Sequence, residues 1–111
     1  MRTTPRHLKA LLRQAAAIAH DRELSAALRD LRAEFDCWGR GDITADELND
    51  RIHRCHDGMS REIWRRYARN HIEPVVAIAV AMAVLSRNEL PKALLDHLAG
   101  LIESYEQDSL R

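Results

Sequence analysis

The chain has 111 residues, a length that fits one domain and is enough to bury a core without disulfides or metal. Hydrophobic residues make up 46% and charged residues 31%, so the composition excludes an intrinsically disordered chain. The formal net charge is zero, which excludes a general electrostatic attraction to nucleic acid or to an acidic membrane. We therefore expect residues 1–111 to form a single domain.

The sequence also lacks the marks of secretion and of membrane insertion. Two cysteines, Cys37 and Cys55, are too few for a disulfide framework, and the N-terminus has no apolar signal segment. The longest apolar run, residues 74–85, is shorter than the ~20 residues that span a bilayer. These features predict a cytoplasmic protein that has no membrane-spanning segment.

The N-terminal third is predicted to be helical. Thr4 is a suitable N-cap and Pro5 a suitable first helical residue. Apolar residues then recur at helical spacing in two stripes that are slightly out of phase across residues 20–23, so residues 5–38 form either one helix or two. The first stripe comprises Leu8, Leu11, Leu12, Ala15, Ile18 and Ala19, and the second comprises Leu24, Leu28, Leu31, Phe35 and Trp38.

The middle third is predicted to be a helical hairpin. Glycines at 39 and 41 mark a turn, and Thr44 with Glu47 three residues later forms a capping box that starts the next helix. That helix is expected to stop at Gly58, and Ser60 to cap another. Four of the five aromatic residues flank this segment and are expected to form one cluster: Phe35, Trp38, Trp64 and Tyr67.

The C-terminal third completes the predicted fold. Residues 75–85 are apolar all round, which is typical of a central buried helix. Asn88 is expected to cap the last helix, with Pro91 in its first turn. The prediction is an all-α protein, a compact bundle of five to six helices around a central apolar helix at about residues 74–86.

The main candidate site lies on the 44–71 hairpin. His53, His56 and Asp57 form its densest run of reactive side chains, and the two histidines are one helical turn apart. Arg61, Arg65 and Arg69 recur every four residues on one face of the following helix. Such a face is either a solvated lattice of ion pairs or a docking surface for an acidic partner or a phosphate. The lattice would use four pairs within the chain: Glu47–Arg51, Asp50–Arg54, Glu62–Arg66 and Arg69–Glu73.

Metal binding is the first chemical alternative. His53 and His56, with Cys37 from the preceding helix, could supply three zinc ligands. The sequence has no second paired ligand set, however, and a hydrogen-bonded structural role for the histidines is favoured. We therefore expect no metal and no cofactor.

Nuclease chemistry is the second alternative. Arg66 and His71 spell R-x4-H, which resembles the motif of the HEPN ribonuclease superfamily. The resemblance implies a metal-independent ribonuclease in which this arginine and histidine act on the RNA phosphodiester in a dimer cleft. It covers six residues, and Tyr67 stands where that family usually has a polar residue.

The residues favour a small non-catalytic interaction or regulatory module that presents the Arg/His face of the hairpin to a protein partner. A structural homo-oligomer, held by the apolar stripes of the first and last helices, is a further alternative. Nucleic acid is not the favoured partner, because the net charge is zero.

Overall fold

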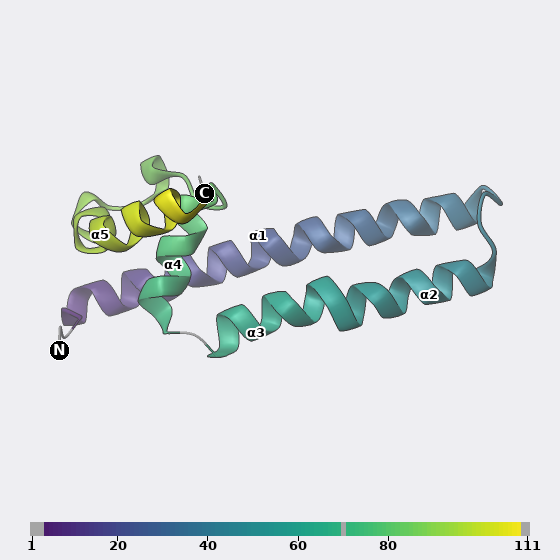
Figure 1. The fold of residues 1–111 in the computed structure, drawn as a ribbon, viewed down its shortest axis with the longest axis horizontal. Helices are drawn as coiled ribbons and strands as arrows, with labels where there is room; N and C mark the ends of the chain where they lie inside the picture. The colour runs from purple at the N-terminus through teal and green to yellow at the C-terminus, as the bar shows by residue number, and fades with distance from the viewer. Residues whose placement is uncertain (1–3, 70, 110–111) are drawn as a thin grey trace.

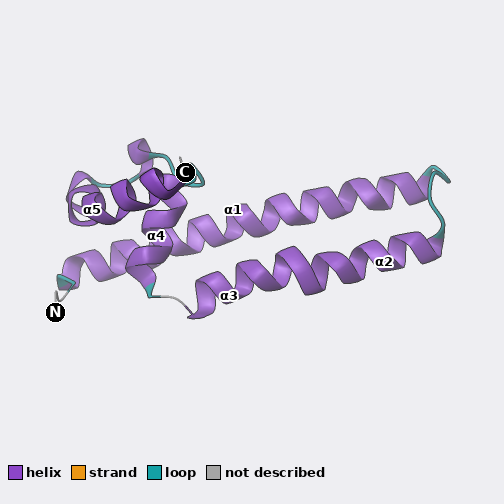
Figure 2. Cartoon of the chain, in the orientation of Figure 1, coloured by secondary structure: helices purple, strands orange, loops and turns teal. Residues whose placement is uncertain are grey.

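The computed structural model describes residues 4–69 and 71–109, and this part of the chain contains helices and loops but no strand (Figure 2). The all-α class is thus confirmed. Within the same residues, no helix is both long and apolar enough to cross a bilayer. The elements are α1 (Arg6–Gly39), α2 (Ala45–Cys55), the π-helix η1 (His56–Ser60), α3 (Arg61–Arg69), α4 (Ile72–Ala81), the 3-10 helix η2 (Arg87–Glu89) and α5 (Lys92–Ser109).

The molecule is elongated, measuring 54 × 29 × 25 Å, because α1 extends well beyond the other helices that pack on its first half (Figure 1). Its radius of gyration is 17.4 Å, whereas a compact domain of similar length has about 13 Å. Because α2, η1 and α3 follow one another without a break, four helical rods result. The predicted compact bundle of five to six helices is therefore not confirmed.

Two parts share α1. We call α4, α5 and residues 6–19 of α1 the packed end, and residues 20–69 the hairpin, in which α1 runs antiparallel to the rod of α2, η1 and α3 (Figure 1). The core of the packed end combines leucines and alanines of α1 with valines, alanines and leucines that follow. Its buried members are Leu8, Leu12, Ala15, Ala19, Val76, Ala77, Ala79, Val80, Leu85, Leu94, Leu98 and Ile102.

One continuous helix covers the region for which the sequence left two alternatives. It starts at Arg6 after Pro5, whose carbonyl accepts bonds from Leu8 and Lys9. The predicted N-cap at Thr4 is wrong, because the Thr4 hydroxyl instead hydrogen-bonds the Glu73 carboxylate on α4. The same carboxylate lies 2.6 Å from Nε2 of His97 on α5. This contact ties the start of α1 to both helices of the packed end.

The apolar helix α4 ends at Ala81, several residues before the predicted end. Ala83 adopts φ +60°, a left-handed conformation that normally calls for glycine. The amide of Val84 bonds the Ala79 carbonyl at 2.8 Å, and the amide of Ala83 bonds the Val80 carbonyl at 3.0 Å. This pattern is a Schellman motif, so the backbone turns away from the helix although the sequence remains apolar. Because α4 packs on α1 and α5, it is the centre of the packed end and not of the whole chain.

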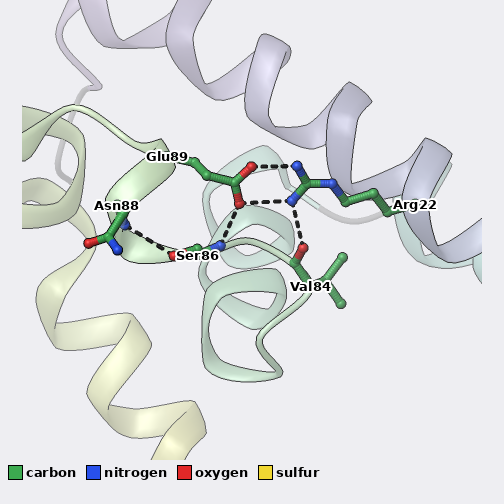
Figure 3. Close-up of polar contacts among 5 residues, drawn as sticks. All are labelled: Arg22, Val84, Ser86, Asn88 and Glu89. Carbon is green, nitrogen blue, oxygen red and sulfur yellow. Dashed lines mark hydrogen bonds and ion pairs between the residues drawn. The ribbon is translucent and has the colours of Figure 1, made fainter.

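A second capping box follows this turn. The Ser86 side chain accepts from the amide of Asn88, and the Glu89 carboxylate accepts from the amide of Ser86 at 2.8 Å (Figure 3). The cap predicted at Asn88 is thus wrong. The last helix begins instead after Pro91, whose carbonyl accepts from the amides of Leu94 and Leu95.

Arg22 of α1 joins the middle of the long helix to this loop. Its guanidinium forms a forked pair with both oxygens of Glu89 and also donates to the Val84 carbonyl at 3.0 Å (Figure 3). The bond from Arg22, helped by the Ser86 amide, lowers the pKa of Glu89 from 4.5 to about 2. The bond from Glu89 in turn raises the pKa of Arg22.

Candidate functional site

The hairpin is held together by ion pairs between its two rods. Nη1 of Arg66 lies 2.6 and 2.8 Å from the two oxygens of Glu23, and Arg51 pairs with Glu34 further along. The sequence had assigned these two arginines to pairs within their own helix, with Glu62 and Glu47, and that assignment is wrong. The pairs instead fix the register of α1 against the second rod.

Tyr67 strengthens the same contact near the base of the hairpin. Its ring centroid lies 4.9 Å from that of His20 on α1. Burial, followed by the hydrogen bond with the Glu23 carboxylate, raises the pKa of Tyr67. Glu23 thus serves two side chains of α3, and its own side chain is only 14% exposed.

The candidate residues lie on the second rod, which begins with the predicted capping box. The Thr44 hydroxyl accepts from the Glu47 amide at 3.1 Å, and the Glu47 carboxylate accepts from the Thr44 amide. The rod does not stop at Gly58, and Ser60 is not an N-cap, because residues 56–60 form a π-helical turn that joins α2 to α3. π-helical turns inside α-helices frequently occur at functional sites.

A hollow of about 300 Å³ opens beside this turn and is lined by His56, Ser60, Arg61 and Trp64. Trp64 is 56% exposed, which is unusual for so large an apolar side chain. His56 lies with Nδ1 3.2 Å from the Asp57 carboxylate, and both side chains are exposed. The structure therefore brings His56 and Arg61 together at one hollow, as the candidate site requires.

The remaining predicted residues lie around the hollow or outside the description. His53 and Arg65 are exposed on the same rod but do not line it. The side chain of Arg69 lies outside the described part of the chain. We define the π-turn surface as His53, His56, Asp57, Arg61 and Arg65 together with the hollow. The sequence predicts neither Ser60 nor Trp64 for this site, because Ser60 is typical of a helix cap and Trp64 of a buried aromatic cluster.

The arginines of the π-turn surface differ from the two arginines of the same rod that pair with α1. Within residues 4–69 and 71–109, no ion pair reaches Arg61 or Arg65, whereas Arg51 and Arg66 are both engaged with α1. Arg61 and Arg65, which the four lattice pairs also leave out, are thus the arginines of this surface that can meet a partner.

The opposite flank of the hairpin carries a groove along the seam between the rods. It consists of two adjoining hollows of about 230 and 400 Å³, both lined by Ala27, Asp30 and Met59. The first also includes Leu31, Glu34, Arg51, Arg54 and Cys55, and the second includes Glu23, Ala26, Glu62, Ile63, Arg66 and Met82. We call these two hollows the seam groove.

The predicted aromatic cluster is wrong. Phe35 and Trp38 lie near the tip of the hairpin and are 43% and 47% exposed. Trp64 and Tyr67 lie toward its base, since Tyr67 contacts His20. Because the rods are long and antiparallel, aromatic residues that are close to the turn in α1 face the start of α2, not α3 (Figure 1).

The metal alternative requires a cluster of ligands. Among the residues that the structure describes, no group of three His, Cys, Asp or Glu side chains could hold a metal ion, so Cys37 does not join His53 and His56. Cys37 instead lies 3.4 Å from Nη2 of Arg40 in the turn at the tip. The thiols of Cys37 and Cys55 are both free.

The two residues of the R-x4-H motif lie in different elements. Arg66 lies in α3 and is held by Glu23, whereas His71 is the exposed N-cap residue of α4. The Arg66 side chain is 24% exposed. In this structure Arg66 therefore joins α3 to α1 through its ion pair with Glu23.

No protein-family model, no curated protein and no solved structure matches this chain. Its function is therefore inferred from the geometry of the hairpin.

Proposed function

We propose that this chain is a non-catalytic interaction module that captures an acidic protein partner on the π-turn surface. One observation carries the proposal: Arg61 and Arg65 stand without ion-pair partners among the described residues, next to a tryptophan that is 56% exposed. Arg51 and Arg66, by contrast, are already paired with Glu34 and Glu23 of α1.

The residue types suit a binding surface. Tryptophan and arginine are enriched among the side chains that contribute most to protein–protein affinity, especially where they line a pocket. The hollow beside Trp64 offers such a pocket, and Arg61 lies in its wall. A carboxylate of the partner would meet a guanidinium that has no competing carboxylate to release first.

The scaffold suits binding as well. The ion pairs from Glu23 and Glu34 hold the rod that carries the surface against α1. A surface that is already ordered loses less conformational entropy when a partner binds. We further propose the cytoplasm as its compartment, where the free thiols of Cys37 and Cys55 stay reduced.

The test is capture of a partner from a lysate of the source cells by the tagged protein. The double variant Arg61→Glu, Arg65→Glu is expected to keep its helical circular dichroism spectrum and to lose the captured protein, because the charge of the surface is reversed. The matched control is Lys9→Glu, Arg13→Glu, which reverses two exposed charges on the packed end. Equal capture by the Arg61/Arg65 variant and the wild type would refute the proposal.

A second arm checks the chemistry of the partner. Capture is expected to weaken as the salt concentration rises from about 0.05 to about 0.5 M, because screening weakens exposed charge pairs. The captured protein should also carry an acidic patch or segment. Capture that is independent of salt would contradict an electrostatic docking surface.

A further inference from the structure

The hairpin has an apolar flank on which three large side chains are exposed in the described structure. Its stripe on α1 is formed by Leu24, Leu28 and Phe35, of which Leu28 is 50% and Phe35 43% exposed. The facing rod contributes Ile52, which is half-buried, and Trp64. We call these five residues the apolar face.

Helix geometry places all five residues on one flank. Leu28 and Phe35 each follow a residue of the seam groove, Ala27 and Glu34, and so lie about 100° further round α1. Leu24 follows the groove residue Glu23 by the same step. On the second rod, Ile52 follows Arg51 and Trp64 follows Ile63, and both Arg51 and Ile63 line the groove. Because the rods are antiparallel, a rotation of about 100° along each chain turns toward the same flank of the hairpin in both rods. The apolar face is thus opposite the seam groove.

The packed end does not obstruct this flank. Met82, just after α4, lines the seam groove together with Ala26 and Asp30, which places α4 on the groove side. The core residues of α1 from Leu8 to Ala19 continue the same helical stripe toward Ala26. The apolar face is therefore open along the whole hairpin.

The hairpin alone is thinly packed. Among the described residues that lie between 20 and 69, only Ala27, Leu48 and Ile63 are buried apolar side chains. Two antiparallel helices can bury only the stripes that face each other, and helical proteins usually add further helices to cover the remaining apolar stripes. The exposed leucine, phenylalanine and tryptophan therefore indicate that another layer belongs on this flank.

We propose that this layer is the apolar face of a second copy of the chain, so that two hairpins form an antiparallel four-helix bundle. The whole flank of the hairpin that carries this face, residues 20–39 of α1 beside the second rod, is about 30 Å long and about 20 Å wide, since neighbouring helices lie about 8–10 Å apart. It therefore offers about 600 Å² per copy and about 1,200 Å² in a dimer, which reaches the range of specific interfaces. When the same apolar face of both copies forms the interface, the dimer has two-fold symmetry.

The charges select one of two possible arrangements. The two-fold axis lies in the plane between the copies and runs either across the hairpin, perpendicular to its rods, or along it, parallel to them. An axis across the hairpin would place the second rod, which carries Arg61 and Arg65, over the same rod of the other copy. An axis along the hairpin places α1 of one copy over the second rod of the other copy. Glu23 pairs with Arg66, so Asp21 lies close to the level of Arg65, and this arrangement brings opposite charges together. We infer the axis along the hairpin, which places the two tips side by side.

This inference goes beyond the proposed capture of an acidic protein and does not depend on it. The π-turn surface meets the apolar face only at Trp64. Arg61 lies at the outer edge of the rod, so a second copy would bring Asp21 near Arg65, form one wall beside the hollow and leave Arg61 accessible.

The first experiment measures molar mass by light scattering over a range of concentrations from about 1 to about 500 µM. The wild type is expected to approach twice the 12.7 kDa of one chain as the concentration rises. Phe35→Glu and Leu28→Glu are each expected to raise the dissociation constant at least tenfold with unchanged helical circular dichroism, because both residues are exposed in the isolated chain. The matched control is Met82→Glu, which changes a side chain that is 56% exposed on the groove side. A wild type that stays monomeric, or variants that dimerise like the wild type, would overturn the proposal.

The second experiment measures the distance between tips. In a Cys37→Ser, Cys55→Ser background, a spin label at Asp42→Cys in the exposed turn is expected to give a distance of about 15 Å between the labelled positions, excluding the label arms, since the tips lie diagonally across a four-helix bundle. An axis across the hairpin would give about 35 Å, because the tips would point in opposite directions. The longer distance would overturn the inferred arrangement. Loss of partner capture in Arg61→Glu, Arg65→Glu with an intact dimer would show that the two surfaces act separately.

Discussion

Arg66 on α3 donates through one nitrogen to both carboxylate oxygens of Glu23 on α1, at 2.6 and 2.8 Å, and both side chains are largely shielded from water. Their positions in the chain are 43 residues apart, so this contact closes the base of the hairpin. Since the hairpin carries the π-turn surface, the pair has a structural consequence for the proposed site.

Removing one partner of this pair is expected to destabilise the fold. Arg66→Met leaves the shielded Glu23 carboxylate without its main cation, and we expect the free energy of unfolding to fall by about 1–3 kcal/mol. Urea denaturation followed by circular dichroism measures this change. The control is Arg54→Met on the same rod, where an exposed substitution should change stability by less than about 0.5 kcal/mol. Equal effects of both variants would contradict the structural role of the pair.

The start of the second rod gives a prediction about capping. Thr44→Ala removes the acceptor of the Glu47 amide, and we expect it to lower the free energy of unfolding by about 1 kcal/mol. Ser60→Ala is the matched control, since Ser60 lies inside the continuous rod and should tolerate alanine within about 0.5 kcal/mol. Thermal denaturation of the two variants compares them directly. A larger decrease in the free energy of unfolding for Ser60→Ala than for Thr44→Ala would instead support a helix that starts at Ser60.

Two positions with left-handed backbone predict opposite effects of the same chemical exchange. Ala83 has φ +60°, so Ala83→Gly is expected to raise the free energy of unfolding by about 0.5–1 kcal/mol. Gly41 has φ +81°, and nothing lies within 4 Å of the point that a Cβ would occupy there, so Gly41→Ala should lower it by about 1 kcal/mol through backbone strain alone. Urea unfolding of both variants tests the pair, and a loss of stability in Ala83→Gly would argue against the Schellman motif.

The lowered pKa of Glu89 predicts a dependence of stability on pH. Because the folded pKa of about 2 lies below the ordinary 4.5, the Arg22–Glu89 contact stabilises the folded state above pH 4.5, and this contribution is lost as the pH falls toward 2. Glu89→Gln should therefore be less stable than the wild type at about pH 7, and the difference should shrink between pH 4.5 and 2. Urea unfolding at several pH values measures it, with Glu103→Gln on the exposed side of α5 as the control. A difference that does not change with pH would be inconsistent with this contact.

Local signals in the sequence predicted local structure well. The capping box at Thr44 and Glu47 is present because its bonds lie within four residues of one another. The apolar run after Pro74 forms a buried helix for a similarly local reason. The all-α class follows from the helical spacing of apolar residues along the whole chain.

The failures have a common physical cause in contacts between distant segments. Gly58 and Ser60 are typical of a helix end and start, but a π-helical turn carries the chain through, since the packing of the rod on α1 outweighs a cost of about 1 kcal/mol for one glycine. The arginines at 51 and 66 have acidic neighbours in their own helix, yet they pair with α1, because the register of the hairpin brings closer carboxylates. The early end of α4 could not be predicted, because the left-handed position there is occupied by Ala83 and not by a glycine.

The sequence and the structure also differ at the candidate site. His56 and Arg61, which the sequence groups in one candidate site, line one hollow and are joined through a π-turn and not across a break. The exposure of Trp64 could not be read from the sequence, because it depends on which flank of the rod faces α1. The apolar stripe at Leu24, Leu28 and Phe35 was recognised, but its lack of cover becomes visible only when α4 and α5 are placed on the other flank.

The uninterrupted helix α1 fixes the position of the packed end relative to the tip of the hairpin. Its 34 residues form a rod of about 50 Å without a proline or glycine before its last residue, so no joint lies between the packed end and the tip. A partner held near the π-turn would therefore keep a fixed distance and orientation relative to the packed end. The length of this one helix thus sets the distance from the packed end to the tip of the hairpin.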